Sequence, residues 1–231
     1  MLPYIFMKVE IRKYRPSDKD EVCTLFISGN LEHIRPCFLK AMSSPLHLTT
    51  TLSLCAAGYL LGSVFGAVVL PGVWVGLIYY CCHRVHSSYV QKKLQTDMQD
   101  IPGNYLSRQD DCFWVAEAEV DRRPRIIGMV AVLVKHSGKE RQGEMFRMVI
   151  LPLCRRMGLG FRMTQTVIDF CKERGFSELV LATTSSHTSA VAMYKKMGFS
   201  LVLSHINMYV SPWISFLSNV KILRMKIDLK S

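Results

Sequence analysis

The sequence contains no Asp, Glu, Lys or Arg between Ala41 and His83, whereas the rest of the chain is ordinarily polar. Soluble domains of this size do not normally contain so long an uncharged stretch. A helix needs roughly 20 apolar residues to cross a bilayer, so the stretch suffices for one generous crossing or two tight ones. It follows a polar segment, which is not the arrangement of a signal peptide. We therefore expect a membrane insert at residues 41–83.

Two arrangements of this insert are compatible with the sequence, a hairpin and a single span. Residues 9–16 alternate like a strand, and if this strand joins the later strands in one sheet, both flanks lie on the same side of the membrane. Basic residues on both flanks, such as Lys40 and Arg84, agree with two cytosolic flanks, because Lys and Arg favour that side. We favour a hairpin or re-entrant anchor with its turn at 62–66 or 70–72.

The eight cysteines include no Cys-x-x-Cys pair and no Cys/His spacing typical of zinc sites. We therefore expect no structural metal. A disulfide framework is not expected either, because a chain of 231 residues that is 49% apolar can build a core without one. Adjacent Cys81 and Cys82 follow the apolar run and are candidates for palmitoylation, although buried thiols are more common.

Acidic residues are scarce relative to basic ones, with 18 Asp and Glu against 29 Lys and Arg, a formal net charge of +11. Such an excess favours anionic partners, unless it is only a scattered and solvated surface charge. No block of Lys and Arg typical of nucleic-acid binding is present. We therefore expect a phosphate-bearing small ligand and membrane lipid as partners, and no nucleic acid.

Periodicity predicts one α/β domain with a mixed sheet, interrupted by the insert. Residues 8–40 supply the first strand and helix of this domain, 41–83 the insert, and 84–230 the main part. Strands are predicted at 9–16, 112–120, 125–135, 144–152, 177–184, 199–210 and 221–229. Helices are predicted at 17–31, 87–101, 158–174 and 189–197.

Polar and small residues mark the ends of these helices. Ser17 is the expected N-cap of the first, and Ser87 or Ser88 of the second, which Pro102 and Gly103 should end. Gly175 and Gly198 are expected to end the last two helices. The basic run at 121–125 is predicted to be a turn.

The stretch CRRMGLGFRM, residues 154–163, follows a strand-like run and begins a predicted helix. A helix start presents unpaired N–H groups and a positive dipole end, and glycines allow a ligand to approach closely. The GxGxxG spacing of dinucleotide folds and the Gly-Lys-Ser/Thr of a P-loop are both missing. The pattern predicts a phosphate or pyrophosphate cradle outside those two classes.

Two segments resemble signatures of the GCN5-related N-acetyltransferase (GNAT) family. MVILPLCRRMGLG, residues 148–160, is similar to its acetyl-CoA segment, and AVAMYKKMGF, residues 190–199, to its second signature, Ala-x-x-apolar-Tyr-x-x-x-Gly-Phe. The resemblance covers residues 8–40 loosely and 87–230 well. The apolar insert is also similar to that of the membrane-bound camello-like branch, which includes cysteine S-conjugate, aspartate and endoplasmic-reticulum lysine acetyltransferases.

The resemblance implies a GNAT-type central sheet flanked by helices and specific roles for residues. Backbone groups of β-strand residues would pair with the pantetheine arm of acetyl-CoA, and amides of the turn would bind its pyrophosphate. The implied donor-binding residues are Met148, Val149, Ile150, Arg155, Arg156, Met157, Gly158, Leu159 and Gly160. Tyr194 matches the tyrosine that protonates the departing thiolate in many members, although it could also be a core tyrosine.

A general base for the acceptor amine is less evident. Glu144 matches a position that contains the base in some lysine-acetylating relatives, and Glu117 is the competing candidate, although strand carboxylates are often simply exposed. His187 departs from the family, which often has Asn or Gln there. It could bond the donor or a loop, although a surface histidine is the commoner case.

The resemblance implies a membrane-anchored, acetyl-CoA-dependent N-acetyltransferase without a metal. The expected acceptor is the α-amine of a small molecule such as a cysteine S-conjugate. A protein lysine is the enzymatic alternative, and a membrane-tethered binding module without turnover is the alternative of another class. The implied location is the endoplasmic-reticulum membrane, with the catalytic domain facing the cytosol.

Overall fold

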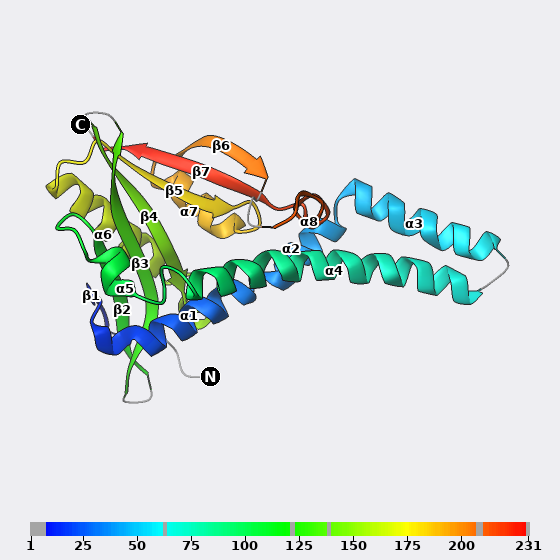
Figure 1. Cartoon of the computed structure of the whole chain (residues 1–231), viewed down its shortest axis with the longest axis horizontal. Helices are drawn as coiled ribbons and strands as arrows, with labels where there is room; N and C mark the ends of the chain where they lie inside the picture. Colours follow the sequence, from blue (N-terminus) through cyan, green and yellow to red (C-terminus); the bar gives the residue numbers. More distant parts are fainter. Residues whose placement is uncertain (1–7, 62–63, 121–122, 138–139, 207–209, 230–231) are drawn as a thin grey trace.

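A seven-stranded sheet forms the centre of the globular part of the molecule (Figure 1). The structure, a computed structural model, describes residues 8–61, 64–120, 123–137, 140–206 and 210–229. In chain order the strands are β1 (Val9–Lys13), β2 (Cys112–Val120), β3 (Arg123–Ser137), β4 (Glu140–Ile150), β5 (Glu178–Thr184), β6 (Ser200–Ile206) and β7 (Lys221–Asp228). In space their order is β1-β2-β3-β4-β5-β7-β6. All neighbours are antiparallel except β4 and β5, so the predicted mixed sheet is confirmed.

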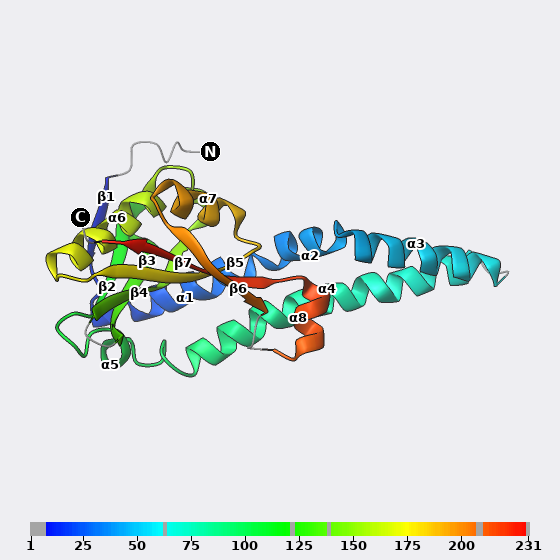
Figure 2. The ribbon, with the colours of Figure 1, turned by 90° about the horizontal axis from the view of Figure 1, so that it is seen from above.

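Helices cover both faces of this sheet (Figures 1 and 2). They are α1 (Lys19–Leu31), α2 (Ile34–Met42), α3 (Pro45–Leu60), α4 (Val64–Leu94), α5 (Ile101–Tyr105), α6 (Leu159–Glu173), α7 (Thr188–Lys196) and α8 (Pro212–Ser218). Helices α6 and α7 pack on one face, and α1, the C-terminal part of α4, and α5 pack on the other. In α1 the predicted apolar face is buried through Val22, Leu25 and Phe26.

The N-terminal strand β1 pairs with β2 in an antiparallel register, as the sequence predicts. The chain segments before and after the apolar insert therefore belong to one globular body. Because both ends of the insert begin at this body, α3 and α4 leave it and return to it. The two helices extend away from the sheet side by side (Figures 1 and 2).

Close contact between α3 and α4 depends on small residues. A Cβ atom added at Gly58 would clash with the backbone of Gly66, so only glycine permits this approach. Much of the remaining surface of the pair is apolar and exposed, with Leu60 82% and Phe65 77% accessible. By length and composition α4 is able to cross a membrane, and only 11% of its most apolar window is buried.

Helix α4 continues without a break to Leu94, which corrects the separate helix predicted at 87–101. Ser87 lies inside α4 and its hydroxyl is 3.5 Å from Nδ1 of His83 in the preceding turn, so it caps nothing. Of the two predicted turns, 70–72 is wrong because it lies within α4. The other, 62–66, includes residues 62 and 63, which lie outside the described residues.

The sequence predicts that Pro102 and Gly103 end a helix. In the structure they lie inside the short helix α5. Pro102 is tolerated because the first residues of a helix need no N–H partner. The Asp100 carboxylate caps this helix by accepting a hydrogen bond from the Gly103 amide at 3.0 Å.

Three shorter expectations also differ. Ser17 is not the N-cap of α1, because that helix begins at Lys19 after a 3₁₀ turn in which Asp18 accepts a bond from the amide three residues earlier. Of the predicted turn at 121–125, residues 121 and 122 lie outside the described part and β3 includes the rest. The strand predicted at 199–210 is β6, which begins at Ser200 and ends at Ile206, and residues 207–209 are likewise not described.

Helix α8 was not predicted. Its Ile214 packs with Ile78, Cys81 and Cys82 of α4 in a small core at the base of the α3–α4 pair. Both thiols are fully buried. They therefore act as apolar packing groups here, the more common of the two alternatives.

Candidate active site

The parallel strands β4 and β5 are paired over only part of their length. Their register ends at Met145 with Leu181. Beyond that pair, β4 continues to Ile150 with its other edge on β3, while β5 remains paired with β7. Beyond that pair the β4 edge facing β5 is not paired with another strand, so its backbone N–H and C=O groups can bind an extended chain as an added strand. The predicted residues Met148 to Ile150 lie on this edge.

A bulge interrupts β4 at Arg147, whose backbone has φ of 55°. Between the pairs Phe146 with Ala131 and Val149 with Met129, β4 contains one more residue than β3. Phe146 and Arg147 consequently both face the α1 and α4 side of the sheet. Bulges redirect the backbone groups that follow them, and here those groups belong to the open edge.

A buried network holds Arg147 in this conformation. Arg147 Nε donates to Asp97 Oδ2 at 2.9 Å, and Nη1 donates to the Tyr89 hydroxyl at 2.6 Å. Tyr105 also donates to Asp97. Burial alone would raise the pKa of Asp97, but the charge of Arg147 and these hydrogen bonds lower it to about 2. The network therefore links the bulge to the C-terminal part of α4, to the segment that follows it and to α5.

The turn between β4 and α6 has the geometry of an anion cradle. Arg156 has φ of 62°, and Gly158, the N-cap of α6, has φ of 75°. A Cβ added at Gly158 would meet no atom within 4 Å, so the space beside it is open. The first amides of α6 have no partners within the helix and lie at its positive end. A phosphate group fits these donors.

The predicted donor-binding residues of this turn differ in how exposed their side chains are. Leu159 is buried in the core, so only its backbone can contact a ligand. Met157 is 39% exposed at the cradle. Arg155 donates from Nε to the Ile150 carbonyl at 3.1 Å and forms an ion pair with Glu32 at the end of α1.

Met193, the residue before Tyr194 on α7, lies close to the cradle. A Cβ at Gly160 would lie 3.1 Å from Sδ of Met193 and 3.9 Å from Cε of Met148, so α6, α7 and β4 converge here. Tyr194 is buried, with its ring centroid 5.6 Å from that of Phe199. Burial raises the pKa of Tyr194, so its phenol keeps its proton at physiological pH.

The two candidate bases are engaged elsewhere. Glu144 lies where β4 and β5 are still paired and forms an ion pair with Lys135 of β3. Glu117 on β2 accepts a hydrogen bond from Arg12 Nε at 2.8 Å, two strands away from the open edge. The structure does not bring either carboxylate to the cradle, and their catalytic role stays a prediction.

Three histidines gather at the open end of the gap, and the sequence analysis singled out only His187 among them. The ring centroid of His33 is 3.9 Å from that of His187 and 6.5 Å from that of His86. Nε2 of His187 is buried and has no hydrogen-bond partner in the described part of the chain. Local sequence held no signal for this cluster, because its members come from the junction of α1 and α2, from α4 and from the turn after β5.

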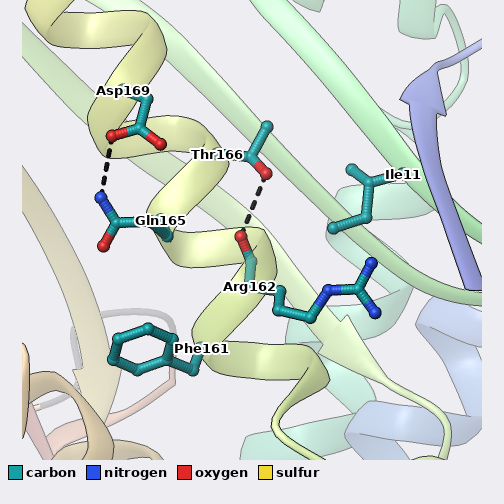
Figure 3. A pocket seen from close by; sticks show the side chains of 6 residues that line it. All are labelled: Ile11, Phe161, Arg162, Gln165, Thr166 and Asp169. Atoms are coloured by element: carbon teal, nitrogen blue, oxygen red, sulfur yellow. Dashed lines mark hydrogen bonds between the residues drawn. The ribbon is translucent and has the colours of Figure 1, made fainter.

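A separate hollow of about 300 Å³ lies against the exposed face of α6 and beside β1 (Figure 3). Of its polar side chains, Gln165 donates to Asp169 at 2.8 Å, and Arg162 Nη2 donates to the Val9 carbonyl of β1 at 3.1 Å. Its lining residues belong to β1 and α6 and not to β4 or β5. Within the described residues, no cluster of His, Cys, Asp or Glu suited to a metal ion is found.

Comparisons with known proteins agree with this geometry. Residues 78–199 match the family model described as acetyltransferase (GNAT) family. The chain is 32% identical to human N-acetyltransferase 8 over 82% of its length and 83% of that protein. It is 29% identical to the Xenopus laevis probable N-acetyltransferase camello over 96% of its length and 99% of that protein.

Among solved structures, a GNAT-family acetyltransferase from Staphylococcus aureus matches with a TM-score of 0.53 and 18% identity. That match covers 96% of this chain and 100% of the other, and at this identity it shows the fold alone. The family match and the curated relatives go further. This chain belongs to the GNAT family of acetyltransferases and is an N-acetyltransferase related to N-acetyltransferase 8 and camello.

Proposed function

We propose that the protein transfers the acetyl group of acetyl-CoA to the α-amine of a small acceptor such as a cysteine S-conjugate. One observation supports this most directly: the open edge of β4 leads into the cradle at the start of α6. An extended arm bound along Met148 to Ile150 would end at the amides of Arg156 to Gly160. Acetyl-CoA has this shape, with a pyrophosphate at one end of an amide-containing arm and a thioester at the other.

Different residues around the gap bind the donor and assist the transfer of its acetyl group. Gly158 leaves room for the pyrophosphate, and the guanidinium groups of Arg155 and Arg156 neutralise its charge. Backbone groups of β4 orient the arm, and its thioester supplies the activated acetyl group. Tyr194 donates its proton to the sulfur that leaves, because burial keeps the phenol protonated until that step.

Helices α3 and α4 are proposed to insert into a membrane. At 1.5 Å per residue, α3 with its 16 residues is about 24 Å long, shorter than the hydrocarbon core of roughly 30 Å. A re-entrant hairpin suits this length better than two complete crossings. With both flanks on one globular body, the catalytic domain would lie on one side, which we propose is the cytosolic side of the endoplasmic reticulum.

The position of the site relative to this hairpin favours an amphipathic acceptor. His86 lies on α4, directly beyond the apolar stretch, and its ring is near His33 at the open end of the gap. A substrate dissolved partly in the bilayer would therefore meet the site close to the membrane surface. A small amine with an apolar substituent matches this route, as an S-conjugate of cysteine does.

Acetyl-CoA consumption by the detergent-purified protein tests the proposal. The acceptor panel is S-benzyl-cysteine, aspartate, free lysine, a histone-tail peptide and a lysine peptide from a luminal protein. Wild type is run beside Tyr194→Phe. Turnover of S-benzyl-cysteine, reduced in the variant, would support the proposed acceptor and the acid role.

Other outcomes would redirect the proposal. Turnover of peptides alone would favour a protein lysine acetyltransferase. Tight binding of acetyl-CoA with no turnover of any amine would instead indicate a membrane-tethered binding module. Equal rates for wild type and Tyr194→Phe would remove Tyr194 from the acid role without affecting the choice of acceptor.

A further inference from the structure

We propose that α8 is a second membrane contact, an interfacial helix whose exposed aromatic side chains lie among the head groups of a bilayer that contains anionic phospholipid. The inference rests on the proposed insertion of the α3–α4 pair into a membrane. It goes beyond that insertion, because α8 lies outside the apolar insert and is distant from it in the sequence.

Helix α8 is held at the base of the α3–α4 pair by its inner face. Ile214 is buried there in a small core with Ile78 and Cys82 of α4. In the last turn of α8, the Leu217 carbonyl accepts a hydrogen bond at 3.0 Å from Nε2 of His47, which lies in the first turn of α3. Because both helices of the pair contact α8, its level along the pair is fixed by packing.

The outer face of α8 is aromatic and exposed. Trp213 is 51% accessible and Phe216 is 63% accessible, and they lie on the same side of the helix because they are three residues apart. Ile214 and Ser218 are buried on the other side. A helix that packs one face on a core normally turns a polar face to water. Two large aromatic side chains on that face indicate contact with a partner other than water.

The level of α8 coincides with the end of the exposed apolar surface of α4. Tyr79 and Tyr80 directly follow Ile78, which packs with α8, and both tyrosines are about half exposed. Arg84 is the first charged residue after the apolar stretch. Tyr and Trp are enriched at the boundary between membrane and water, and Lys and Arg lie beyond it. The order of these residues therefore places the boundary at the level of α8.

The length and orientation of the helices agree with this boundary. From Val64 to Tyr79, α4 extends for about 24 Å, the same length as α3. A re-entrant pair of this depth leaves α8 at the membrane surface through which the pair enters. Helix α8 runs across α4 and not along it (Figure 2). Its axis would therefore lie in the plane of the membrane, which is the orientation of interfacial helices.

The charge of this end of the molecule indicates which surface α8 contacts. Residues 33–96, which include α2, α3 and α4, contain no Asp or Glu, and neither do residues 179–227, which include β6 and α8. Each of the two stretches contains five Lys or Arg residues. One of them, Lys221, is exposed and lies three residues after the end of α8. Such a surface attracts anionic lipid head groups, whereas an identical basic surface of a second copy would repel it.

Quenching of tryptophan fluorescence in the reconstituted full-length protein tests the proposal. The vesicles contain phosphatidylcholine brominated at a shallow or a deep position of its acyl chain, with or without phosphatidylserine. The signal of Trp213 is the difference between wild type and Trp213→Phe. Shallow bromines should quench this signal more than deep ones, and phosphatidylserine should increase the quenching at low salt but less at high salt. The signal of Trp74 in α4, obtained in the same way, reports separately on insertion of the α3–α4 pair.

Two phenylalanine variants form a matched pair for this measurement. Phe216→Glu places a charge on the outer face of α8 and should remove most of the quenching of Trp213. Phe161→Glu makes the same change on α6, which packs on the sheet away from α8, and should leave the quenching as in wild type. Because both side chains are about half exposed or more, neither change should unfold the protein, and thermal unfolding checks this.

The outcomes separate this inference from the proposed function. Quenching of Trp74 without quenching of Trp213 would overturn the inference and leave the insertion of α3 and α4 intact. If acrylamide also failed to quench Trp213, a second protein copy and not lipid would cover α8. Equal quenching of Trp213 with and without phosphatidylserine would overturn the choice of anionic lipid. Quenching of neither tryptophan would count against membrane insertion as a whole, while turnover of S-benzyl-cysteine by the same vesicles tests acetyl transfer independently.

Discussion

Arg147 Nε donates to Oδ2 of Asp97 at 2.9 Å and so joins the bulge of β4 to the segment that follows α4. The guanidinium is almost fully enclosed, with 5% of its side chain exposed, and it lies over the rings of Phe26 and Tyr89. A positive φ in a non-glycine residue such as Arg147 costs conformational free energy, and the hydrogen bonds of this network offset that cost. The apolar helix and the strand proposed to bind the donor are therefore connected through this network.

Asp97→Asn should destabilise the protein strongly, because it leaves the buried charge of Arg147 without an anionic partner. The expected loss is about 3–5 kcal/mol, on the order of 10 °C in Tm for a chain of this size. Thermal unfolding in detergent measures it. Lys226→Gln, which removes the ion pairs of a solvent-accessible lysine to Glu178 and Asp228, should leave Tm nearly unchanged, because solvent screens such pairs. Similar small shifts in both variants would argue against the network.

Gly158→Leu should abolish acetyl-CoA binding by filling the open space of the cradle. Gly175→Leu provides the matched control, since Gly175 has φ of 69° and a Cβ added there would likewise meet no atom within 4 Å. Both substitutions introduce the same backbone strain of roughly 1–2 kcal/mol, but only one lies at the cradle. Equilibrium binding of acetyl-CoA separates the two effects. A comparable loss of affinity in both variants would mean that strain, and not the cradle, is responsible.

Tyr194→Phe should lower kcat without unfolding the protein, because the ring contact with Phe199 is retained. A loss of roughly 10²-fold or more is expected for removal of a general acid. Since burial raises the pKa of Tyr194 above its ordinary value, wild type should show no alkaline fall in kcat from this residue near pH 9. A fall in kcat at that pH that disappears in Tyr194→Phe would contradict this.

Stability should decline as the pH falls below about 6.5. The pKa values of His33 and His187 in the folded protein are lowered to about 4 and about 3, whereas an unfolded histidine titrates near 6.5. Between these values the unfolded state binds more protons, so stability is full above pH 6.5 and is lost as the pH falls toward 4. Thermal unfolding between pH 4.5 and 7.5 without donor measures the slope, which should be shallower in His33→Gln. An identical slope in wild type and variant would count against the buried state of His33.

Tags at the two ends of the chain should lie on the same side of the membrane. The reason is that β1 and β2 pair in one sheet, so the chain segments on both sides of the α3–α4 pair cannot be separated by a bilayer. Protease protection of microsomes containing the tagged protein measures this. Digestion of one tag and protection of the other would indicate a single span and would contradict the pairing of β1 with β2 in the membrane-bound protein.

Local patterns were sufficient for much of the fold. Strand β2 is found at its predicted bounds, and Gly175 and Gly198 follow their helices with positive φ, because left-handed ends favour glycine strongly. Helix boundaries near the insert were predicted poorly. A serine such as Ser87 marks a helix start, and a proline such as Pro102 marks a helix end, only where the neighbouring helical turn does not continue. Packing of α4 against the sheet decides whether that turn continues.

The sequence by itself determined the family and predicted the cradle, because the signatures behind both are short runs of adjacent residues: a strand, a turn and the first turn of α6. The mixed sheet was predicted from the order of strands and helices along the chain. Only the tertiary structure decided which side chains meet at the gap. Glu32 and His33 reach Arg155 and His187 because α1 and the ends of β4 and β5 converge there. Arg147 finds Asp97 across 50 residues for the same reason. Contacts between segments distant in sequence depend on how the elements pack, and no local pattern specifies them.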